Sequence, residues 1–339
     1  MNYFLGVDGG GTSTISYLAN ERGQILGIGK SGPSNYHVVG REGVVEAVNN
    51  SIVAAFKMAK LSIKQEKIEM ACFGLAGIDT KKDYQIINSL LKKKINLTKD
   101  LLLFNDAYLA LAAGNEEAHG IALIAGTGSI AVGINKDGER KRVGGWGHIF
   151  DDRGSGYNIA VNALYAIFRE YDGRGEKTLL SKLFCEYLEL DDPVGIIEKV
   201  YVEKMSRKNI AELAKLVFQA SNEGDMAAIN ILWQAGLDLA ELVYNLIMEL
   251  NINDKKIVLP LFGGVFKSKN RILYKVIKSE LQYKLALAKD IKKVELLKSR
   301  LQAPAGALLL AFDKVGIEIK DEILNNLRGG INYVEKSIS

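Results

Sequence analysis

The feature that most constrains the fold is a unit of three short strands that occurs twice along the chain. Each copy reads as an apolar strand, a glycine–threonine turn, a second strand, an Asn-x-x-Gly turn and a third strand, first over Tyr3–Gly29 and again over Ile121–Val143. At one offset of 115 positions (126 − 11), four pairs of residues coincide without a gap: Gly11 with Gly126, Thr12 with Thr127, Asn20 with Asn135 and Gly23 with Gly138. A chance match of four positions is the alternative, and the shared strand pattern around them argues against it. The duplication predicts two similar α/β domains.

Helix and strand patterns alternate after the first copy. Apolar residues between Val44 and Ala59 recur at helical spacing. Strands are expected at Ile68–Leu75 and Leu101–Asn105, with a helix at about Tyr84–Lys94 between them. This order of elements is typical of a mixed sheet covered by helices.

The chain after the second copy is largely helical. Helical apolar periodicity covers four stretches: Ile159–Tyr171, Leu179–Leu188, Ile210–Glu223 and Ala227–Leu250. A buried strand is expected at Ile257–Leu261, then a helix at about Asn270–Lys284, and Leu301–Phe312 reads as a buried helix in which Gly306 allows close approach. We expect a first lobe over residues 1–117 and a larger second lobe over residues 118–339, with a helical insertion and a final helix that can pack back on the first lobe.

Composition narrows the class of protein. The 339 residues include 44 Lys+Arg and 40 Asp+Glu, a formal net charge of +4, which is weak for a nucleic-acid binder. Cys72 and Cys185 can make no disulfide framework, and within one chain they cannot supply four ligands to an iron–sulfur cluster. The start, Met1–Val7, lacks the positive region of a signal peptide, and the longest uncharged stretch, Gly120–Asn135, is shorter than the roughly 18 apolar residues of a membrane span. We expect a cytoplasmic protein with no membrane partner.

The glycine turns suit phosphate binding. In Asp8-Gly9-Gly10-Gly11-Thr12, the glycines let the chain take positive φ and bring backbone N–H groups and the Thr12 hydroxyl close to phosphate oxygens. The carboxylate of Asp8 beside them suits a divalent metal, directly or through water. No Gly-Lys-Ser/Thr follows, so the motif is not a Walker loop. The alternative, a hairpin turn that merely needs glycine, loses weight because Gly126-Thr127-Gly128-Ser129 repeats the motif.

Two other positions follow apolar strands. Asn105-Asp106 stands at the end of one strand, just before a helix over Tyr108–Ala113. Ligands of open α/β sheets lie at the carboxyl ends of strands, so Asp106 is a candidate catalytic base; the alternative role is a helix N-cap. Gly263-Gly264 follows the strand Ile257–Leu261 and fits close approach of the backbone to a flat group such as adenine, with a helix-entry turn as the alternative.

Polar and aromatic residues occupy corresponding loops after the third strand of each copy. The first loop holds Ser34-Asn35-Tyr36-His37, and the second holds Gly144-Gly145-Trp146-Gly147-His148, followed by Asp151-Asp152-Arg153-Gly154-Ser155-Gly156. Aromatic rings, amides and carboxylates bind polyhydroxylated sugars by stacking and hydrogen bonding. The alternatives are a core position for Trp146 and ordinary, satisfied histidines at 37 and 148. Three histidines in separate segments make no convincing zinc site.

Taken together, these motifs resemble those of the N-acetylglucosamine kinase family, within the BadF/BadG/BcrA/BcrD-type ATPases of the actin-like, hexokinase-like ATPase superfamily. The resemblance runs from Tyr3 to about Phe312 and rests on eight motifs in order: DGGGT at 8–12, GPSN at 32–35, GLAGID at 74–79, ND at 105–106, AGTGS at 125–129, GGWGH at 144–148, DRGSGY at 152–157 and FGG at 262–264. It implies a duplicated actin-like (ribonuclease H-like) α/β fold with two lobes around a nucleotide cleft.

The resemblance also implies roles for single residues. The first phosphate loop would be Gly9, Gly10, Gly11 and Thr12, the second Gly126, Thr127 and Gly128, and the adenosine motif Gly263 and Gly264. Asp8 would support Mg²⁺. The amino sugar would be surrounded by Asn35, Asp106, Gly145, Trp146 and Asp152, with Asp106 as the catalytic base. The implied activity is ATP-dependent phosphorylation of the 6-hydroxyl of N-acetylglucosamine by a homodimer.

Two departures from the family pattern concern the sugar. The family commonly has Gly-Asp-Glu-Gly-Ser where this chain has Asp151-Asp152-Arg153-Gly154-Ser155, and Asn158 stands where a Trp is frequent. Arg153 would favour a sugar with a carboxylate, such as N-acetylmuramic acid; the alternative is that it faces outward into a salt bridge. Glucosamine or another hexose as substrate, a BadF-type activator ATPase and a non-catalytic sugar sensor are the competing functions.

Overall fold

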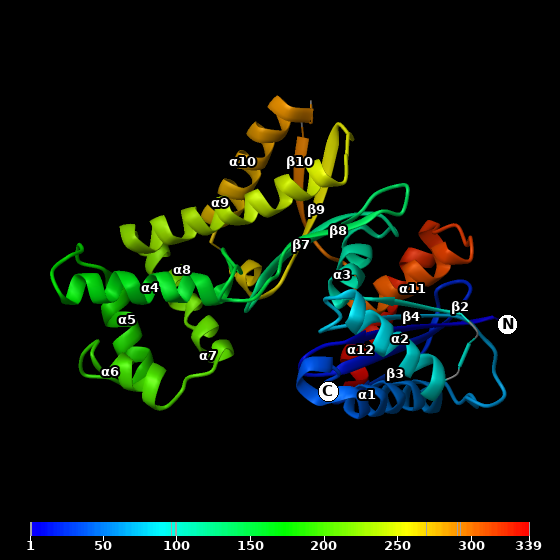
Figure 1. Cartoon of the computed structure of the whole chain (residues 1–339). Coiled ribbons are helices and arrows are strands. Elements are labelled where there is room, and N and C mark those ends of the chain that lie inside the picture. Colours follow the sequence, from blue (N-terminus) through cyan, green and yellow to red (C-terminus); the bar gives the residue numbers. More distant parts are fainter. Residues whose placement is uncertain are drawn as a thin grey trace. The chain divides into compact units, whose positions relative to one another are not determined.

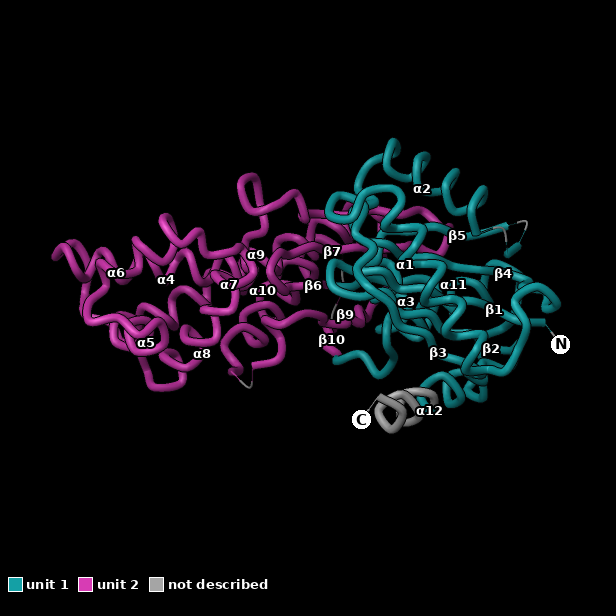
Figure 2. The backbone as a smooth tube through the Cα atoms, turned by 90° about the horizontal axis from the view of Figure 1, so that it is seen from below, with its two compact units in different colours: residues 1–122, 298–339 teal, residues 123–297 magenta. Residues whose placement is uncertain are grey.

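The computed structural model describes residues 2–95, 97–98, 100–268, 270–289, 291 and 293–338, with the backbone alone over 330–338. The chain forms two compact units (Figure 2). Unit 1 comprises Met1–Ala122 and Lys298–Ser339, and unit 2 comprises Leu123–Leu297. The C-terminal stretch therefore belongs to unit 1, where the sequence had suggested only a final helix packing back.

Unit 1 is built on a five-stranded sheet in the order β3-β2-β1-β4-β5 (Figure 2). Its strands are β1 (Tyr3–Gly9), β2 (Thr14–Asn20), β3 (Ile25–Ser31), β4 (Ile68–Leu75) and β5 (Leu101–Phe104). Strands β1, β2 and β3 form an antiparallel meander, whereas β4 runs parallel to both β1 and β5. The carboxyl ends of β1, β4 and β5 therefore lie at one edge of the sheet, where ligands of such sheets bind.

Helices cover both faces of this sheet. Alternate side chains of a strand point to opposite faces: Leu5 and Val7 join the core formed with α1 (Tyr36–Met58) and α2 (Lys81–Lys94), whereas Phe4 packs its ring against Phe312 on the other side.

The second face is covered by α11 (Ala303–Lys314), which also packs against α3 (Asp106–Asn115). Close packing needs glycine at two points: a Cβ on Gly6 would lie 2.3 Å from the Pro304 carbonyl oxygen, and one on Gly306 2.0 Å from that of Leu109. The prediction that Gly306 allows close approach is confirmed.

The second sheet repeats the topology of the first. Its order is β10-β9-β6-β7-β8, with β6 (Gly120–Ala125), β7 (Ser129–Ile134), β8 (Arg140–Gly144), β9 (Lys256–Phe262) and β10 (Lys293–Lys298). Read from the meander inward, β8-β7-β6-β9-β10 corresponds strand by strand to β3-β2-β1-β4-β5. Strand β9 is parallel to β6, as β4 is to β1. The duplicated α/β fold predicted from the repeat is confirmed.

The repeated Asn-x-x-Gly turns share their hydrogen bonds as well as their sequence. The Asn20 side-chain oxygen accepts from the backbone N–H groups of Arg22 and Gln24, and that of Asn135 accepts from Asp137 and Glu139 in the same pattern. Both turns end in glycines with positive φ, 74° at Gly23 and 81° at Gly138. The match of local bonding at the offset of 115 residues shows that the two copies are structural repeats.

Unit 2 carries an additional group of helices between β8 and β9 (Figure 1). They are α4 (Gly156–Tyr171), α5 (Leu179–Leu188), α6 (Gly195–Ile197) with the π-turn Glu198–Val202, α7 (Arg207–Glu212), α8 (Ala214–Asn222) and α9 (Met226–Glu249). The expected helix Ile210–Glu223 is broken at Leu213, whose N–H bonds to Ile210 in a tighter turn. Helix α9 is long and apolar enough to span a membrane by length and composition, but it packs in unit 2 against α8, β7 and α10 (Ile272–Lys289).

Candidate active site

The first glycine turn, Gly9–Thr12, joins β1 to β2 and is tied to the start of α1. The Gly10 N–H donates to the Ser13 carbonyl (2.9 Å), and the Ser34 N–H donates to the Gly10 carbonyl (3.0 Å). Among the described residues, the backbone N–H groups of Gly11 and Thr12 and the Thr12 hydroxyl have no hydrogen-bond partner in the chain. The turn therefore presents three donors of the kind that bind phosphate oxygens.

The second glycine turn, Gly126–Ser129, is held in the same way. The Gly156 N–H at the start of α4 donates to the Gly126 carbonyl (2.8 Å), and the Ser129 hydroxyl donates to the Arg153 carbonyl (2.7 Å), as the Thr14 hydroxyl donates to Gly32 in the first copy (2.8 Å). The N–H and hydroxyl of Thr127 and the Gly128 N–H have no partner in the described part of the chain. Each copy thus offers one threonine and adjacent N–H groups.

The expected positive φ at these turn glycines is wrong. None of Gly9, Gly10, Gly11, Gly126 or Gly128 has positive φ. Gly9 is needed for space instead, because a Cβ there would lie 2.1 Å from the Ser34 hydroxyl oxygen. Gly128 likewise leaves space for neighbouring side chains, whereas a Cβ on Gly11 would meet nothing within 4 Å.

The third glycine position lies beside the second turn. Strands β6 and β9 are parallel, with Ile124 opposite Phe262, so the segments after them are neighbours. Gly263 has a φ of 101°, and a Cβ there would lie 2.2 Å from the Ala125 carbonyl oxygen. Only glycine fits at this position. Unit 2 thus brings together two of the predicted nucleotide motifs.

A pair of partly buried carboxyls lies at the strand ends of unit 1. Asp8 is the next-to-last residue of β1, and burial together with the charge of Asp106 raises its pKa to about 7. Burial also raises the pKa of Asp106 to about 6, while the Ala107 N–H opposes this and the charge of Asp79 adds to it. Neighbouring carboxyls whose pKa values are raised by desolvation and by acidic charges are typical of acid–base sites.

Asp106 is free of the capping role that was the alternative for it. The N-cap of α3 is Asn105, whose side-chain oxygen accepts from the Ala107 N–H (3.1 Å). The Asn105 amide group donates to the Asp79 carboxylate (3.3 Å) and the Ile78 carbonyl (3.5 Å). Asn105 thus joins the segments after β4 and β5 and leaves the Asp106 carboxyl at the first position of the helix.

Asn35 is the N-cap of α1, which begins at Tyr36, inside the stretch that the sequence predicted as a loop. Its side-chain oxygen caps the helix by accepting from the His37 N–H (3.0 Å), and Gly77, with a φ of 86°, lies against it. Its amide nitrogen has no hydrogen-bond partner among the described residues. Asn35 therefore retains donors for a ligand on the same unit as Asp8 and Asp106.

The loop after β8 carries Gly145 and Trp146 in unit 2. Gly145 has a φ of 73°, and the Trp146 side chain is 59% exposed, so the alternative of a core aromatic is wrong. The Arg142 guanidinium lies over the indole, 4.0 Å from its centroid. An exposed indole suits stacking on a sugar ring.

Asp152 is buried and forms an ion pair within unit 2. It is 3% exposed, with a φ of 61°, and its two carboxylate oxygens bond to the Ser129 N–H (3.1 Å) and to the Arg207 guanidinium. Arg207 escaped sequence analysis because no motif surrounds it and its partner lies 55 positions away. Arg153 is exposed, and its charge lowers the pKa of Asp238, which burial raises.

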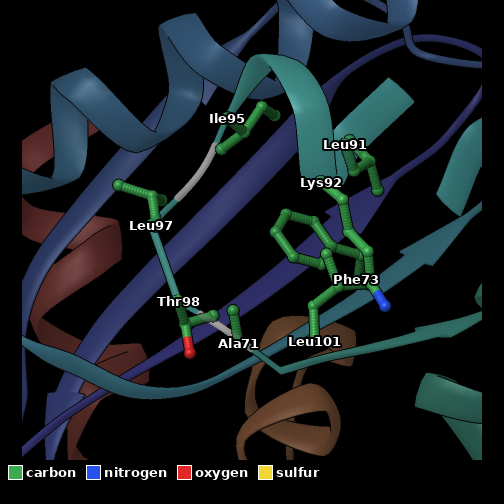
Figure 3. A pocket seen from close by; sticks show the side chains of 8 residues that line it. All are labelled: Ala71, Phe73, Leu91, Lys92, Ile95, Leu97, Thr98 and Leu101. Carbon is green, nitrogen blue, oxygen red and sulfur yellow. The ribbon is translucent and has the colours of Figure 1, made fainter. Parts of the chain in front are cut away.

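Among the described residues, neither a cluster of metal ligands nor the pocket of Figure 3 coincides with the predicted site residues. No group of three histidine, cysteine or acidic side chains that could hold a metal exists in the parts of the chain that the structure describes. The pocket in Figure 3 lies on unit 1 between α2 and the strands β4 and β5. Its lining is mostly apolar and contains none of the predicted site residues: Ala71, Phe73, Leu91, Lys92, Ile95, Leu97, Thr98 and Leu101.

Comparison with known proteins agrees with this geometry. Over 311 residues the chain is 33% identical to an N-acetylmuramic acid/N-acetylglucosamine kinase of Clostridium acetobutylicum, covering 92% of this chain and 98% of that protein. An N-acetyl-D-glucosamine kinase of Dictyostelium discoideum is 31% identical over 318 residues, 91% and 98% of the two chains.

Solved structures share the fold. A candidate N-acetylglucosamine kinase from Chromobacterium violaceum superposes with a TM-score of 0.67 at 25% identity, covering 92% of this chain and 99% of that one. A ROK family glucokinase from Streptomyces griseus superposes with a TM-score of 0.53 at 16% identity, over 91% and 98% of the two chains. The family model described as the BadF/BadG/BcrA/BcrD ATPase family matches residues 5–311, and the chain belongs to that family.

Proposed function

We propose that this protein is an ATP-dependent kinase that transfers the γ-phosphoryl group to the 6-hydroxyl of N-acetylglucosamine, and also accepts N-acetylmuramic acid. The observation that carries the proposal is that each unit holds a turn with free donors, and that unit 1 also holds a carboxyl with a raised pKa, Asp106, directly after β5. Two relatives named as kinases of these sugars match nearly the whole chain.

The reaction assigns a task to each group. The phosphates of ATP bind at the turns Gly9–Thr12 and Gly126–Gly128, and adenosine lies at Gly263-Gly264. Asp106 accepts the proton of the sugar's 6-hydroxyl, and the oxygen of that hydroxyl forms a bond to the γ-phosphorus. The bond between the γ-phosphorus and the bridging oxygen breaks, and ADP leaves with its electron pair. The protein contributes position and charge rather than covalent chemistry.

Several groups are candidate ligands of the sugar. Asn35 offers its amide donors, and Gly145 and Trp146 offer a backbone and an exposed indole face. The family resemblance adds Asp152 to this set, but both of its carboxylate oxygens already have partners in unit 2.

A pKa of about 7 fits Asp8 to a divalent cation. A desolvated carboxylate beside the acidic Asp106 is unstable in its ionised form, and a cation would stabilise it. Because the described residues hold no group of three such ligands, the other ligands would be phosphate oxygens and water, as is usual for Mg²⁺. Bound Mg²⁺ would neutralise charge on the β- and γ-phosphates.

The family resemblance supports a cytoplasmic homodimer. The activator ATPases of the wider family need an iron–sulfur cluster, often held between two subunits with two cysteines from each. Cys72 and Cys185 are single and far apart in the sequence, without the paired spacing of such ligands. A kinase therefore fits the residues better than an activator.

A coupled ADP-release assay with five sugars tests the proposal. We expect ATP consumption with N-acetylglucosamine and N-acetylmuramic acid to exceed that with glucosamine, glucose and N-acetylmannosamine. The product should carry phosphorus on the C6 oxygen by ³¹P-coupled NMR. Turnover confined to glucose or glucosamine would transfer the proposal to another hexose, and no turnover with any sugar would reject it.

A further inference from the structure

The space beside the second glycine turn is filled by an ion pair from distant segments. A Cβ on Gly128 would lie 2.8 Å from the Asp152 carboxylate and 2.9 Å from the Arg207 guanidinium. The guanidinium therefore lies within contact distance of the backbone that presents the Thr127 and Gly128 N–H groups. Glycine at 128 leaves the space that the pair occupies.

Asp152 and Arg207 differ in their exposure and in the hydrogen-bonding groups that remain without a partner. The Asp152 side chain is 4% exposed, and its two oxygens bond to Arg207 and to the Ser129 N–H. The Arg207 side chain is 37% exposed, and its Nε is buried without a hydrogen-bond partner among the described residues. A guanidinium has five N–H donors, so Arg207 keeps donors and an exposed edge after binding Asp152.

Two neighbours orient the Arg207 side chain. Its guanidinium bonds to the Asp152 carboxylate, and the guanidinium carbon lies 6.0 Å from the centroid of the Tyr157 ring on α4. Ser206 caps α7 immediately before Arg207, which fixes the start of that helix.

We propose that Arg207 binds the phosphates of the nucleotide at the second turn and that Asp152, its ion-pair partner, positions it there. The inference rests on the proposed function and deepens it. Arginine presents paired donors that match phosphate geometry, and its charge opposes the negative charge of the transferring group. The same pair keeps Ser129, and so the turn, in register.

Nucleotide affinity in the absence of sugar tests this directly. Calorimetric titration with the non-hydrolysable analogue AMPPNP and Mg²⁺ is carried out on the wild type, Arg207→Ala, Arg207→Lys and Asp152→Asn. We expect the Kd to rise by about tenfold or more in Arg207→Ala, as for a lost charge-assisted bond, and less in Arg207→Lys. The matched control is Arg174→Ala, which removes an exposed arginine paired with Asp172 in the same unit and should leave the Kd unchanged.

The KM for ATP tests the positioning role of Asp152. We expect Asp152→Asn and Arg207→Lys both to raise the KM for ATP, and Arg207→Lys to leave the KM for N-acetylglucosamine within about twofold. An unchanged nucleotide affinity in Asp152→Asn would overturn the positioning role. An unchanged AMPPNP Kd in Arg207→Ala would overturn the inference as a whole.

Two further measurements keep the test decisive. Circular dichroism and thermal unfolding show whether each variant folds, and Arg207→Gln, which retains much of the side chain's length, replaces Arg207→Ala if that variant does not. A wild type that binds AMPPNP in an Arg207-dependent manner but phosphorylates no amino sugar would reject the proposed function and leave this inference standing. A wild type that binds no nucleotide would reject both.

Discussion

At the scale of single residues, the account depends on how Asn105 and Asp106 divide their tasks. Asn105 caps α3 and bonds to Asp79, so Asp106 is left with a partly buried carboxyl whose pKa is about 6. Such a group is mostly ionised at neutral pH, yet it is a stronger base than an exposed aspartate. That is the balance expected of a general base.

Replacing Asp106 with Asn should therefore remove the base and little else. We expect kcat to fall by about 10²–10⁴-fold, the usual contribution of general base catalysis, with the AMPPNP Kd nearly unchanged. Steady-state kinetics and calorimetry on the same preparation measure both. A near-normal rate would reject Asp106 as the base.

The pH dependence follows from the same pKa. Because the base must be ionised, kcat/KM for the sugar should rise with pH through about 6 and level off above it. Bound Mg²⁺·ATP adds charge nearby, so the profile is recorded at saturating nucleotide. A rate that is flat between pH 5 and 7.5 would contradict the assignment.

The raised pKa of Asp8 predicts how the stability of the protein depends on pH. Its pKa rises from 3.8 to about 7 on folding, so between these values the folded state binds more protons than the unfolded state. The free energy of unfolding contributed by this group therefore falls as pH rises from about 4 to 7. Without Mg²⁺, Asp8→Asn should raise the Tm at pH 8 and change it little near pH 4. An equal effect at both pH values would show that burial does not perturb this carboxyl.

At the scale of elements, each glycine turn follows a strand and is hydrogen-bonded to the segment at the start of a helix. In unit 2 Gly263 also packs against this turn. Its positive φ and the 2.2 Å that would separate a Cβ from the Ala125 carbonyl oxygen both exclude a side chain. Gly263→Ala should lower the free energy of unfolding by roughly 1–3 kcal/mol, the cost of a strained conformation, and weaken nucleotide binding.

The control for Gly263 is Gly32→Ala, where a Cβ would meet nothing within 4 Å. Urea denaturation of both variants measures the difference. Equal stability of the two would mean that the segment after β9 does not pack on the second turn as described.

Element boundaries were predictable where hydrophobic periodicity was strong. The strands of both meanders and the helix Leu179–Leu188 match the sequence pattern. Strand β10 was missed because Lys293–Lys298 is a charged strand at the edge of its sheet, where lysine commonly prevents unwanted pairing. The break at Leu213 was missed because apolar spacing continues across it.

At the scale of the whole molecule, the internal repeat predicted two sheets of one topology, and it also indicated the two turns. The repeat did not predict which unit would hold α11. That depends on tertiary packing, because α11 lies against β1 at Gly6 and against α3 at Gly306. Nor did the repeat reveal Arg207, whose pairing with Asp152 exists only in the folded unit. Local motifs therefore predicted most of the candidate site residues, whereas an ion pair between distant positions could be found only in the folded structure.

The central claim is that the turn of each repeat binds the phosphates of one nucleotide. Calorimetric titration with AMPPNP and Mg²⁺ tests it most directly, on the wild type and on Thr12→Val and Thr127→Val, which remove the unpartnered hydroxyls. The account predicts one nucleotide per chain and a weaker Kd in both variants. Two nucleotides per chain, or a Kd that either substitution leaves unchanged, would contradict it.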